Sequence, residues 1–520
     1  MKGTSAAQTD VAEPLILAGA RLPGGTGPVD VHLADGSVAA IVPADADADA
    51  PRGDGHGDGD AAVRRIELDG RFVVPGLHDR HVHMSQWSMV VRREDLSGIE
   101  SAAAAVALVA GLVARGEPEV IGMGYRDGLW PDTQSRAALD AVSGDVPVVL
   151  VSGDLHSCWV NSAAARRHGF DGIAGESGVL REDDCFRLTG MLDDVADEVL
   201  DGWVAEAAAA AAARGVVGIT DYEMRWNRDD WARRAGSGIR SLRVAFGVYT
   251  QHLDRAIELG LRTGDDVPGT EGLISVGGYK VITDGSLNTR TAWCFDPYPG
   301  LEGHPHACGA PNVPLEELVP LMRRADAAGI TPAVHAIGDR ANAAVLDAFE
   351  QVRPSGWHGR GATIEHAQLL RRDDLARFAA LGIIASVQPE HAMDDRDVAD
   401  RYWAGRTDRA FMLASLEAVG VELALGSDAP VAPLDPWIAI SAAVGRTRDG
   451  REPWHPEQAI EARAALAAST GGRGAEVVVG SPADIAVVEL DPLAASVDDL
   501  RAMPVAATLL GGRFTHSLIE

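Results

Sequence analysis

From about residue 195 onward, the chain repeats one order of segments: an Ala-rich amphipathic stretch, a glycine and a short β-branched run. WVAEAAAAAAARG is followed by VVGITDYE, and LEELVPLMRRADAAG is followed by ITPAVHAIGD. Glycine readily adopts the left-handed conformation in which helices commonly end. The glycines expected to end helices in this way are Gly215, Gly329, Gly382 and Gly420. The pattern therefore predicts helices that alternate with strands.

The predicted strands are nearly all apolar, which is typical of a parallel sheet whose faces are covered by helices. Eight segments qualify as strands: VVPGLHDRHVH, GITDYE, SLRVAFGVY, VGGYKVITD, TPAVHAIGD, ATIEHAQ, IIASVQPE and ELALGSD. Eight strand–helix units are the number that closes a (β/α)8 TIM-like barrel. We therefore expect an α/β fold of this class.

Both ends of the chain read as alternating strands outside the barrel. LILAGARL and VDVHLADGSVAAIV lie near the N-terminus, with a hairpin turn expected at Asp35-Gly36, and ADIAVVELDP and AATLLGGRFTH lie near the C-terminus. The expected domains are a small β-sandwich built from residues 12–74 and 477–520 and a barrel over residues 75–476, within which residues 98–200 form a lid-like insertion.

The composition excludes two classes of partner. Asp and Glu outnumber Lys and Arg by 76 to 46, and the resulting charge of −30 would repel nucleic acid and anionic membranes. The four cysteines contain no CxxC pair, as expected in a reducing compartment. Residues 1–20 show no basic start followed by a signal-peptide core, and no segment approaches the roughly 20 apolar residues of a membrane span. We expect a cytoplasmic protein that acts on a small molecule, with residues 44–62 forming an acidic, solvated loop.

Polar residues gather at the C-terminal ends of the predicted strands. His81 and His83 are two residues apart, so they project from the same face of the first strand. In a barrel these strand ends meet at one mouth, where such folds carry out their chemistry. Imidazole and carboxylate groups together suit zinc or another divalent ion. The candidate metal ligands are His81, His83, Lys280, His335, His366 and Asp428.

Each of these residues alone has a simpler interpretation. A single histidine in an apolar strand is usually a hydrogen-bonded core residue, and Asp428 in SDAP could begin a helix. Six such residues at strand ends are harder to explain in this way, because buried charge is costly unless it is paired or bound to a metal. The joint pattern therefore favours a metal site over six separate structural roles.

The HxH of the first strand, followed in order by the lysine, two histidines and the aspartate, resembles the amidohydrolase superfamily of metal-dependent hydrolases. Further segments are similar to its amidohydrolase-3 branch, which includes N-substituted formamide deformylases: GYRDGLWPD, GDLHSCWVNSAA, KVITDGSLNTRTA, HAIGDRAN, SVQPEH and GRTRDGREPWHPEQ. The resemblance covers roughly residues 14–515.

This resemblance implies two metal ions at the barrel mouth, either zinc or else iron or manganese. In relatives, the residues matching the strand-one histidines and Asp428 bind the more buried ion, and those matching His335 and His366 bind the second. A carboxylated lysine often bridges the two ions, and Lys280 matches that position. An unmodified lysine would leave a site for one ion. Relatives also suggest a homodimer.

The expected reaction is metal-assisted hydrolysis of a carbon–nitrogen bond in an amide, N-acyl or N-formyl group. We expect Asp428 to accept a proton from the attacking water and to return it to the leaving nitrogen. Two other classes stay open: a hydrolytic deaminase or another hydrolase of the superfamily, and a noncatalytic metal-stabilised binding protein. Deaminases of this fold usually lack a bridging lysine, and a noncatalytic relative need not keep its proton acceptor. Lys280 and Asp428 therefore argue against these two classes.

Four polar residues outside the strands are further candidates. His156 lies in the insertion segment GDLHSCWVNSA, and the resemblance implies that it contacts substrate; a surface loop is the alternative. Arg290, after the DGS turn of the fourth strand, could bind a substrate carboxylate or pair with an acidic neighbour. His391 follows the seventh strand near the mouth, whereas His455 is expected to hold a loop in place.

Overall fold

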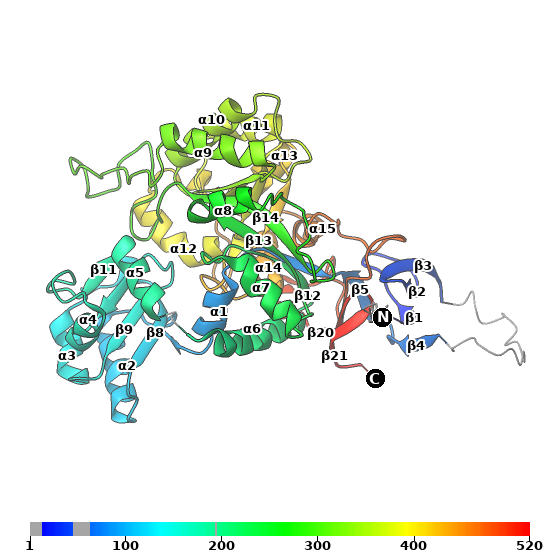
Figure 1. The fold of residues 1–520 in the computed structure, drawn as a ribbon, viewed down its shortest axis with the longest axis horizontal. Coiled ribbons are helices and arrows are strands. Elements are labelled where there is room, and N and C mark those ends of the chain that lie inside the picture. Colours follow the sequence, from blue (N-terminus) through cyan, green and yellow to red (C-terminus); the bar gives the residue numbers. More distant parts are fainter. Residues whose placement is uncertain (1–12, 45–62, 193–194, 520) are drawn as a thin grey trace, which may run out of the picture.

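The eight predicted barrel strands form one parallel sheet in the computed structural model of this chain (Figure 1). The structure describes residues 13–44, 63–192 and 195–519, so the expectations for the first 12 residues and for residues 45–62 lie outside the described residues. In pairing order the strands are β6 Leu77–Val82, β12 Val216–Asp221, β13 Arg243–Tyr249, β14 Ile274–Ile282, β15 Pro332–Ala336, β16 Thr363–His366, β17 Ile384–Val387 and β18 Leu423–Leu425.

The first and last strands of this sheet meet and close the barrel. The backbone N–H of Asp428 donates to the carbonyl of His81 over 2.8 Å, and that of His83 donates to Ala429 over 2.8 Å. Val82 and Ala429 form a parallel bridge at the same place. The predicted eight-stranded barrel is therefore confirmed, and its closure lies beside the first two candidate ligands.

Helices surround the barrel, as the glycine pattern predicted. Gly215, Gly329, Gly382 and Gly420 all have positive φ, between 64° and 85°, and Gly329 and Gly382 directly cap two of the helices. The helices are α1 Met84–Val90, α6 Asp197–Ala212, α7 Asn227–Gly236, α8 Leu253–Glu258, α9 Leu315–Ala328, α10 Asp339–Val352, α11 Arg372–Leu381, α12 Pro389–Tyr402, α13 Leu413–Ala418, α14 Pro436–Gly445, α15 Ala462–Ala468 and α16 Val497–Arg501. Short 3-10 turns lie at Asp127–Leu129, Thr250–His252, Thr407–Arg409 and Pro456–Gln458.

The segment between α1 and α6 folds as a separate layer beside the barrel (Figure 1). It comprises β7 Glu94–Asp95, α2 Ala102–Ala114, β8 Val120–Tyr125, α3 Arg136–Ser143, β9 Val148–Ser152, β10 Ser157–Val160, α4 Ser162–His168, β11 Val179–Arg181 and α5 Asp183–Leu192. Val149 and Val151 of β9 enter one apolar core, and Val148 and Leu150 enter the other, because successive side chains point to opposite faces. The insertion therefore has its own core on each face of its sheet.

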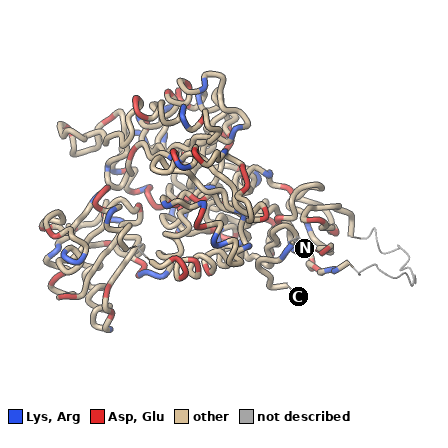
Figure 2. The backbone as a smooth tube through the Cα atoms, viewed as in Figure 1, with Lys and Arg blue, Asp and Glu red and all other residues tan. Residues whose placement is uncertain are grey.

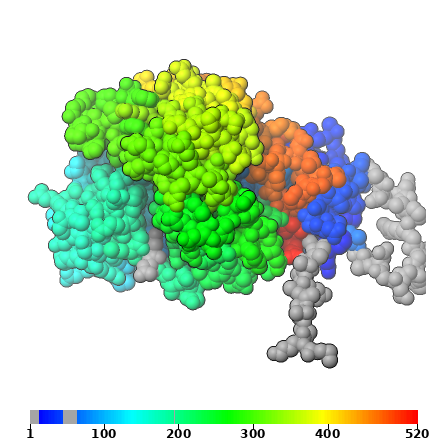
Figure 3. Space-filling view, turned by 45° about the horizontal axis from the view of Figure 1, so that its top comes forward, coloured from blue at the N-terminus to red at the C-terminus, as the bar shows by residue number. Residues whose placement is uncertain are grey.

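The two chain ends together form a pair of four-stranded sheets on the other side of the barrel (Figures 1 and 3). Many of their buried residues form one cluster, which includes Leu17 and Val31 of the first sheet and Ile485 and Leu509 of the second. Others, such as Val74 and Val488 of the second sheet, belong to the barrel core. The strands are β1 Leu15–Ala20, β2 Val29–Ala34, β3 Ser37–Pro43 and β4 Arg64–Glu67 in one sheet, and β5 Phe72–Pro75, β19 Ile485–Val488, β20 Val505–Leu510 and β21 Arg513–Ser517 in the other. The exact residue limits proposed for the domains stay predictions.

Positive and negative residues are interspersed along the described chain (Figure 2). Among the described residues, no helix combines the length and the apolar character that a bilayer span requires. The four cysteines are free thiols, three of them buried.

Candidate metal centre

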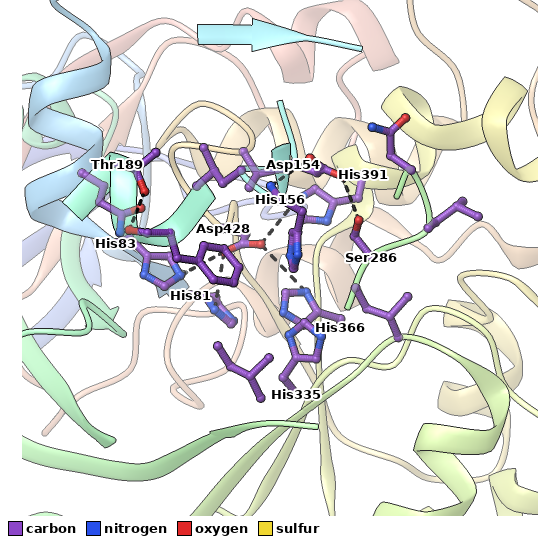
Figure 4. A pocket seen from close by; sticks show the side chains of 18 of the residues that line it. His81, His83, Asp154, His156, Thr189, Ser286, His335, His366, His391 and Asp428 are labelled. Atoms are coloured by element: carbon purple, nitrogen blue, oxygen red, sulfur yellow. Dashed lines mark hydrogen bonds and ion pairs between the residues drawn. The ribbon is translucent and has the colours of Figure 1, made fainter. Parts of the chain in front are cut away.

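The predicted ligands converge on one cavity at the C-terminal mouth of the barrel (Figure 4). All six line it, although they come from five strands that are distant in sequence. His81 lies in β6 and His366 ends β16, while Asp428 follows β18. Because parallel strands end at the same rim, the sheet itself brings these side chains together.

His81, His83 and Asp428 form a compact group. Nε2 of His81 lies 3.5 Å from Asp428 Oδ1, and Nε2 of His83 lies 3.4 Å from the same oxygen. Two ligand atoms that each lie about 2.1 Å from a tetrahedral zinc ion are about 3.4 Å apart. The spacing of these three atoms therefore suits one shared divalent ion.

Asp428 also faces a second group, formed with His366 and His391. Its Oδ2 lies 3.9 Å from Nδ1 of His366 and 3.9 Å from Nε2 of His391. The ligand atoms of each three-residue group lie within 4.8 Å of one another. Asp428 can thus contribute one carboxylate oxygen to each side of the cavity.

His335, the expected partner of His366, takes a different position from His391. Its ring centroid lies 4.4 Å from that of His366, but its Nε2 lies 3.4 Å from the buried carboxylate of Asp284. Asp284 in turn accepts hydrogen bonds from the backbone of Ile337 at 3.0 Å, just beyond β15. His391 was expected near the mouth after the seventh strand, and it lies there, on helix α12; a ligand role for it was not predicted.

Two of the site residues adopt an unusual backbone conformation. His366 has a φ of 75° and Asp428 a φ of 57°, in the left-handed region that residues with a side chain seldom adopt. Such strain costs roughly 1–3 kcal/mol and clusters at functional sites, where it aims side chains. His366 is the last residue of β16, and Asp428 lies shortly after the end of β18; both line the cavity.

The protonation states of His81 and His366 suit metal ligands. Burial, together with the charge of Lys280, lowers the pKa of His81 to about 4, and burial also lowers the pKa of His366 well below its usual value. Neutral imidazoles keep the lone pair with which they bind a metal ion. Burial opposes ionisation of Asp428, but the neighbouring imidazoles nevertheless lower its pKa well below the usual range.

A buried carboxylate behind the first ligand was not predicted. Glu365 Oε2 accepts a hydrogen bond from Nδ1 of His81 over 2.7 Å, and its Oε1 accepts one from the hydroxyl of Tyr222 over 3.2 Å. Metal-binding histidines usually donate their other ring N–H in this way, which sets the tautomer. Glu365 leaves Nε2 of His81 free to face the cavity. The signal was present in IEHAQ, since Glu365 precedes a predicted ligand.

Glutamine side chains contact the imidazoles of His366 and His391. Nδ1 of His366 lies 2.9 Å from Gln388 Oε1, and Nδ1 of His391 lies 3.3 Å from Gln368 Nε2. The first contact requires a proton on the histidine nitrogen, because a carbonyl oxygen only accepts. The second requires that Nδ1 of His391 accepts, so its Nε2 carries the proton when the ring is neutral and no ion is bound.

Lys280 lies beside His81 in the same cavity. Its Nζ is 3.1 Å from Nε2 of His81 and 4.4 Å from the ring centroid of Tyr222. Burial lowers the pKa of Lys280 to about 8. A neutral amine is the form that can react with carbon dioxide, so this environment suits the carboxylation that the resemblance implies.

The residues present fit a divalent ion. The cavity presents imidazole nitrogens around a shared carboxylate, a donor set typical of zinc and related metals. Within the described residues, His83 Nδ1, His335 Nε2 and His391 Nε2 are buried and make no hydrogen bond. Buried polar atoms are rarely left without a partner unless they have another role.

The two candidate substrate contacts have different surroundings. His156 lines the cavity from the insertion, where its Nδ1 lies 2.9 Å from the carboxylate of Glu182. Arg290 is not among the described residues that line this cavity; its guanidinium lies 5.2 Å from the ring centroid of Tyr402. Arg290 lies in a tight turn with a φ of 59°, and its side chain packs against α12. The geometry therefore does not support the expectation that Arg290 binds a substrate carboxylate in this cavity.

The chain matches the amidohydrolase family over residues 64–516. It belongs to this family. The resemblance noted in the sequence is thereby confirmed, and so is the use of a metal-dependent hydrolase fold.

Individual relatives agree with the family. Protein LONG AFTER FAR-RED 3 from Arabidopsis thaliana is 30% identical over 437 residues, which cover 78% of this chain and 74% of the relative. N-substituted formamide deformylase from Arthrobacter pascens is 26% identical over 86% of this chain and 89% of its own length. The solved structure of an uncharacterized metal-dependent hydrolase from Pyrococcus horikoshii OT3 superposes with a TM-score of 0.73 at 22% identity, over 94% of this chain and 99% of that one.

In this amidohydrolase, the insertion supplies much of the apolar wall of the cavity. Met123, Leu155 and Phe186 come from the insertion, and Met224 and Ile282 come from the barrel. A cavity with metal ligands at its base and apolar walls above them suits a substrate with one polar reacting group and an apolar substituent.

Proposed function

We propose that this amidohydrolase cleaves a carbon–nitrogen bond of a small molecule, in an amide, N-acyl or N-formyl group. The observation that carries the proposal is the position of Asp428, whose two oxygens face the two histidine groups at the base of a cavity with apolar walls. One carboxylate can thus hold a proton beside the reacting carbon. A relative named as an N-substituted formamide deformylase supports the same bond type.

The roles of the chain's own residues follow from their positions. When bound, a divalent ion lowers the pKa of water and polarises a carbonyl, which is the chemistry that this site lacks without it. Asp428 accepts the proton of the attacking water and returns it to the leaving nitrogen, a role worth about 10²–10⁴-fold in rate. His81 and His83 would hold the ion in place, and the apolar wall excludes bulk water from the reacting atoms.

We further propose that Lys280 carries a carboxyl group and that the site holds two ions, with zinc as the first candidate. Its Nζ lies within 3.1 Å of a ligand nitrogen, and burial favours the reactive neutral amine. Carboxylation would convert a cation into an anion beside His81, and an anionic oxygen is a good ligand for two neighbouring cations.

The first test is the metal content of protein purified without chelator or nickel, measured by plasma mass spectrometry. About two equivalents per chain, with a carbamate signal after incubation in ¹³C-bicarbonate, are expected. One equivalent without that signal would move the site towards a one-metal deaminase. No metal after addition of zinc, manganese or iron with bicarbonate would leave only a metal-free binding protein and contradict the proposal.

The second test is Asp428→Asn, assayed with N-formyl and N-acetyl anilides that release a coloured amine. We expect kcat to fall by at least about 10²-fold, because the amide cannot take up the proton. Asp408→Asn is the matched control, since this exposed carboxylate pairs with Arg372 and is not among the described residues that line the cavity. Equal activity of Asp428→Asn and the unsubstituted protein would contradict the role of Asp428.

A small-molecule substrate, a cytoplasmic location and a homodimer stay predictions from composition and resemblance. The net charge of −30 supports a partner other than nucleic acid or an anionic membrane. Sedimentation of the metal-loaded protein tests the homodimer directly.

A further inference from the structure

The insertion contributes an imidazole–carboxylate pair to the rim of the cavity. His156 immediately precedes β10, and Glu182 immediately follows the antiparallel strand β11. Pairing of Ser157 with Arg181 therefore places the two residues side by side, and the backbone N–H of Glu182 donates to the carbonyl of His156 over 2.9 Å. Their side chains meet as well, with Nδ1 of His156 2.9 Å from Glu182 Oε2.

The barrel holds this pair in place at two points. The hydroxyl of Thr291 donates to Glu182 Oε1 over 3.0 Å, and the hydroxyl of Ser286 donates to Asp154 Oδ2 over 2.7 Å. The other oxygen of Asp154 accepts the backbone N–H of His156 over 3.1 Å. Ser286 and Thr291 both lie in the segment that follows β14, the strand of Lys280. The pair is thus fixed relative to the metal ligands and not only to the insertion.

The orientation of the His156 ring follows from its partner. A carboxylate oxygen only accepts, so Nδ1 of His156 carries the proton in the bond to Glu182. The edge of the ring also packs against Phe186, with centroids 5.4 Å apart. Nε2 is therefore the nitrogen left for the cavity, and the imidazole projects towards His366 and Asp428 (Figure 4).

The surroundings favour the charged form of this imidazole. Burial opposes protonation, but the hydrogen bond to Glu182 and the charges of Asp154, Glu182 and Asp428 raise the pKa of His156 above its usual value. The same contact lowers the pKa of Glu182, although burial acts in the opposite direction. A protonated His156 presents an N–H donor at Nε2.

We propose that His156 is a catalytic residue whose Nε2–H binds the carbonyl oxygen of the substrate, and that Glu182 is its positioning residue. This inference rests on the hydrolase function proposed above. The donor stabilises the negative charge that develops on that oxygen as water attacks the carbonyl carbon, and it needs no movement to do so. Glu182 has no contact with substrate in this scheme; it sets the tautomer and charge of His156.

The variants His156→Ala, His156→Gln and Glu182→Gln test the proposal in the metal-loaded protein, with 4-nitroformanilide and 4-nitroacetanilide as probes. His156→Ala should lose about 10²–10³-fold in kcat at unchanged metal content and nearly unchanged KM, as for loss of one oxyanion donor. His156→Gln, which keeps an N–H donor, should recover part of this loss. In Glu182→Gln, the alkaline limb of the kcat/KM profile should move to lower pH, because the imidazole loses its anionic partner. An ordinary structural contact would not produce this shift.

His455→Ala is the matched control. His455 also contacts a glutamate, with its Nδ1 3.0 Å from Glu457 Oε1, but it lies outside the residues described as lining the cavity. This variant should keep the kcat of the unsubstituted protein. If His156→Ala keeps it as well, with either anilide as the hydrolysed probe, the inference is wrong.

Binding of formate, measured by calorimetry, separates this inference from the proposed function. His156→Ala should bind formate about 10-fold more weakly than His455→Ala, because a charge-assisted hydrogen bond is lost. If neither anilide is hydrolysed, this difference still supports His156 as the donor to a carbonyl or carboxylate oxygen, while the proposed function fails. Equal formate affinity of the two variants overturns the role of His156, whatever the anilides show.

Discussion

At the residue scale, the candidate metal ligand His81 depends on a carboxylate that does not line the cavity. Glu365 is fully buried, and the charge of His81 and the hydrogen bond to it lower the pKa of Glu365 to about 2, despite the opposing effect of burial. The ionised Glu365 holds Nδ1 of His81 and so directs Nε2 to Lys280 and Asp428. Removal of the charge of Glu365 should therefore weaken metal binding, although no candidate ligand is replaced.

Glu365→Gln is therefore expected to lower metal affinity by about 10–100-fold, the range found when partners of metal ligands are replaced. The measurement is competition with a chelator of known affinity, followed by the metal content at each chelator concentration. Glu422→Gln, an exposed glutamate just before β18, is the control and should keep the original affinity. An unaltered affinity in Glu365→Gln would show that the tautomer of His81 does not depend on this charge.

At the element scale, helix α12 connects the metal centre to the insertion. It carries His391 near its N-terminus, and one turn later Asp394 lies 3.0 Å from the guanidinium of Arg126 in the insertion. Arg401, near the other end of α12, donates to the carbonyl of Gly128 over 2.8 Å. The insertion thus docks along α12, the helix that carries the candidate ligand His391. We expect that a change that loosens the insertion also loosens α12.

Arg126→Ala tests this connection. Asp395, 3.6 Å from Arg126, already has a pKa raised to about 6 by burial, and loss of the guanidinium would raise it further. Arg126 is partly exposed and Asp394 keeps Arg448, so we expect a cost of ~1–2 kcal/mol, well below that of a fully buried pair. Amide hydrogen exchange in α12 should accelerate about 10-fold.

The control for this experiment is Arg167→Ala, because Arg167 pairs with Glu119 inside the insertion, 2.9 Å away, and makes no described contact with α12. Exchange in α12 should stay as in the unsubstituted protein. Equal exchange rates in the two variants would mean that Arg126 does not couple the insertion to the helix.

At the scale of the whole molecule, one buried carboxylate joins the terminal sheets to the barrel. Asp484, next to β19, has a fully buried side chain and accepts hydrogen bonds from Arg243 of β13 at 2.8 Å and from Arg473 at 2.6 Å. It also accepts the backbone N–H of Gly511 over 2.8 Å, in the turn between β20 and β21. Replacement of such a charge leaves two guanidinium groups without their partner.

Asp484→Asn should destabilise the protein by about 3–5 kcal/mol, measured as a lower midpoint of urea unfolding at pH 7. The two arginines lower the pKa of Asp484 in the folded state, although burial opposes them. The ionised carboxylate therefore stabilises the fold above the unfolded pKa of about 3.9, and this contribution is lost as pH falls through the lower, folded value. The stability of Asp484→Asn should therefore fall less between neutral and acidic pH than that of the unsubstituted protein.

Asp69→Asn is the matched control, since this exposed carboxylate lies 3.6 Å from Arg71. Surface pairs contribute about 0–1 kcal/mol, so the urea midpoint should hardly move. If Asp484→Asn unfolds at the midpoint of this control, the terminal sheets do not depend on Asp484.

The local patterns of the chain determined the barrel and brought its six candidate ligands to one cavity. β-branched runs form strands, glycines end helices through the left-handed conformation, and period two puts His81 and His83 on one face. These effects act between residues close in sequence. Because parallel strands end at one rim, a polar residue at each strand end was enough to predict that Lys280, His366 and Asp428 would meet.

Tertiary structure alone decided which groups approach those ligands from elsewhere. His391 was expected near the mouth, but the direction of helix α12 decides that it faces Asp428. Glu365 supports His81 across the barrel interior, and Glu182 reaches His156 through strand pairing in the insertion. These contacts join residues from different elements, and their formation depends on helix orientation, strand register and side-chain direction. A one-dimensional pattern carries no such information, because hydrophobic periodicity specifies which face of an element is buried but not which partner that face meets.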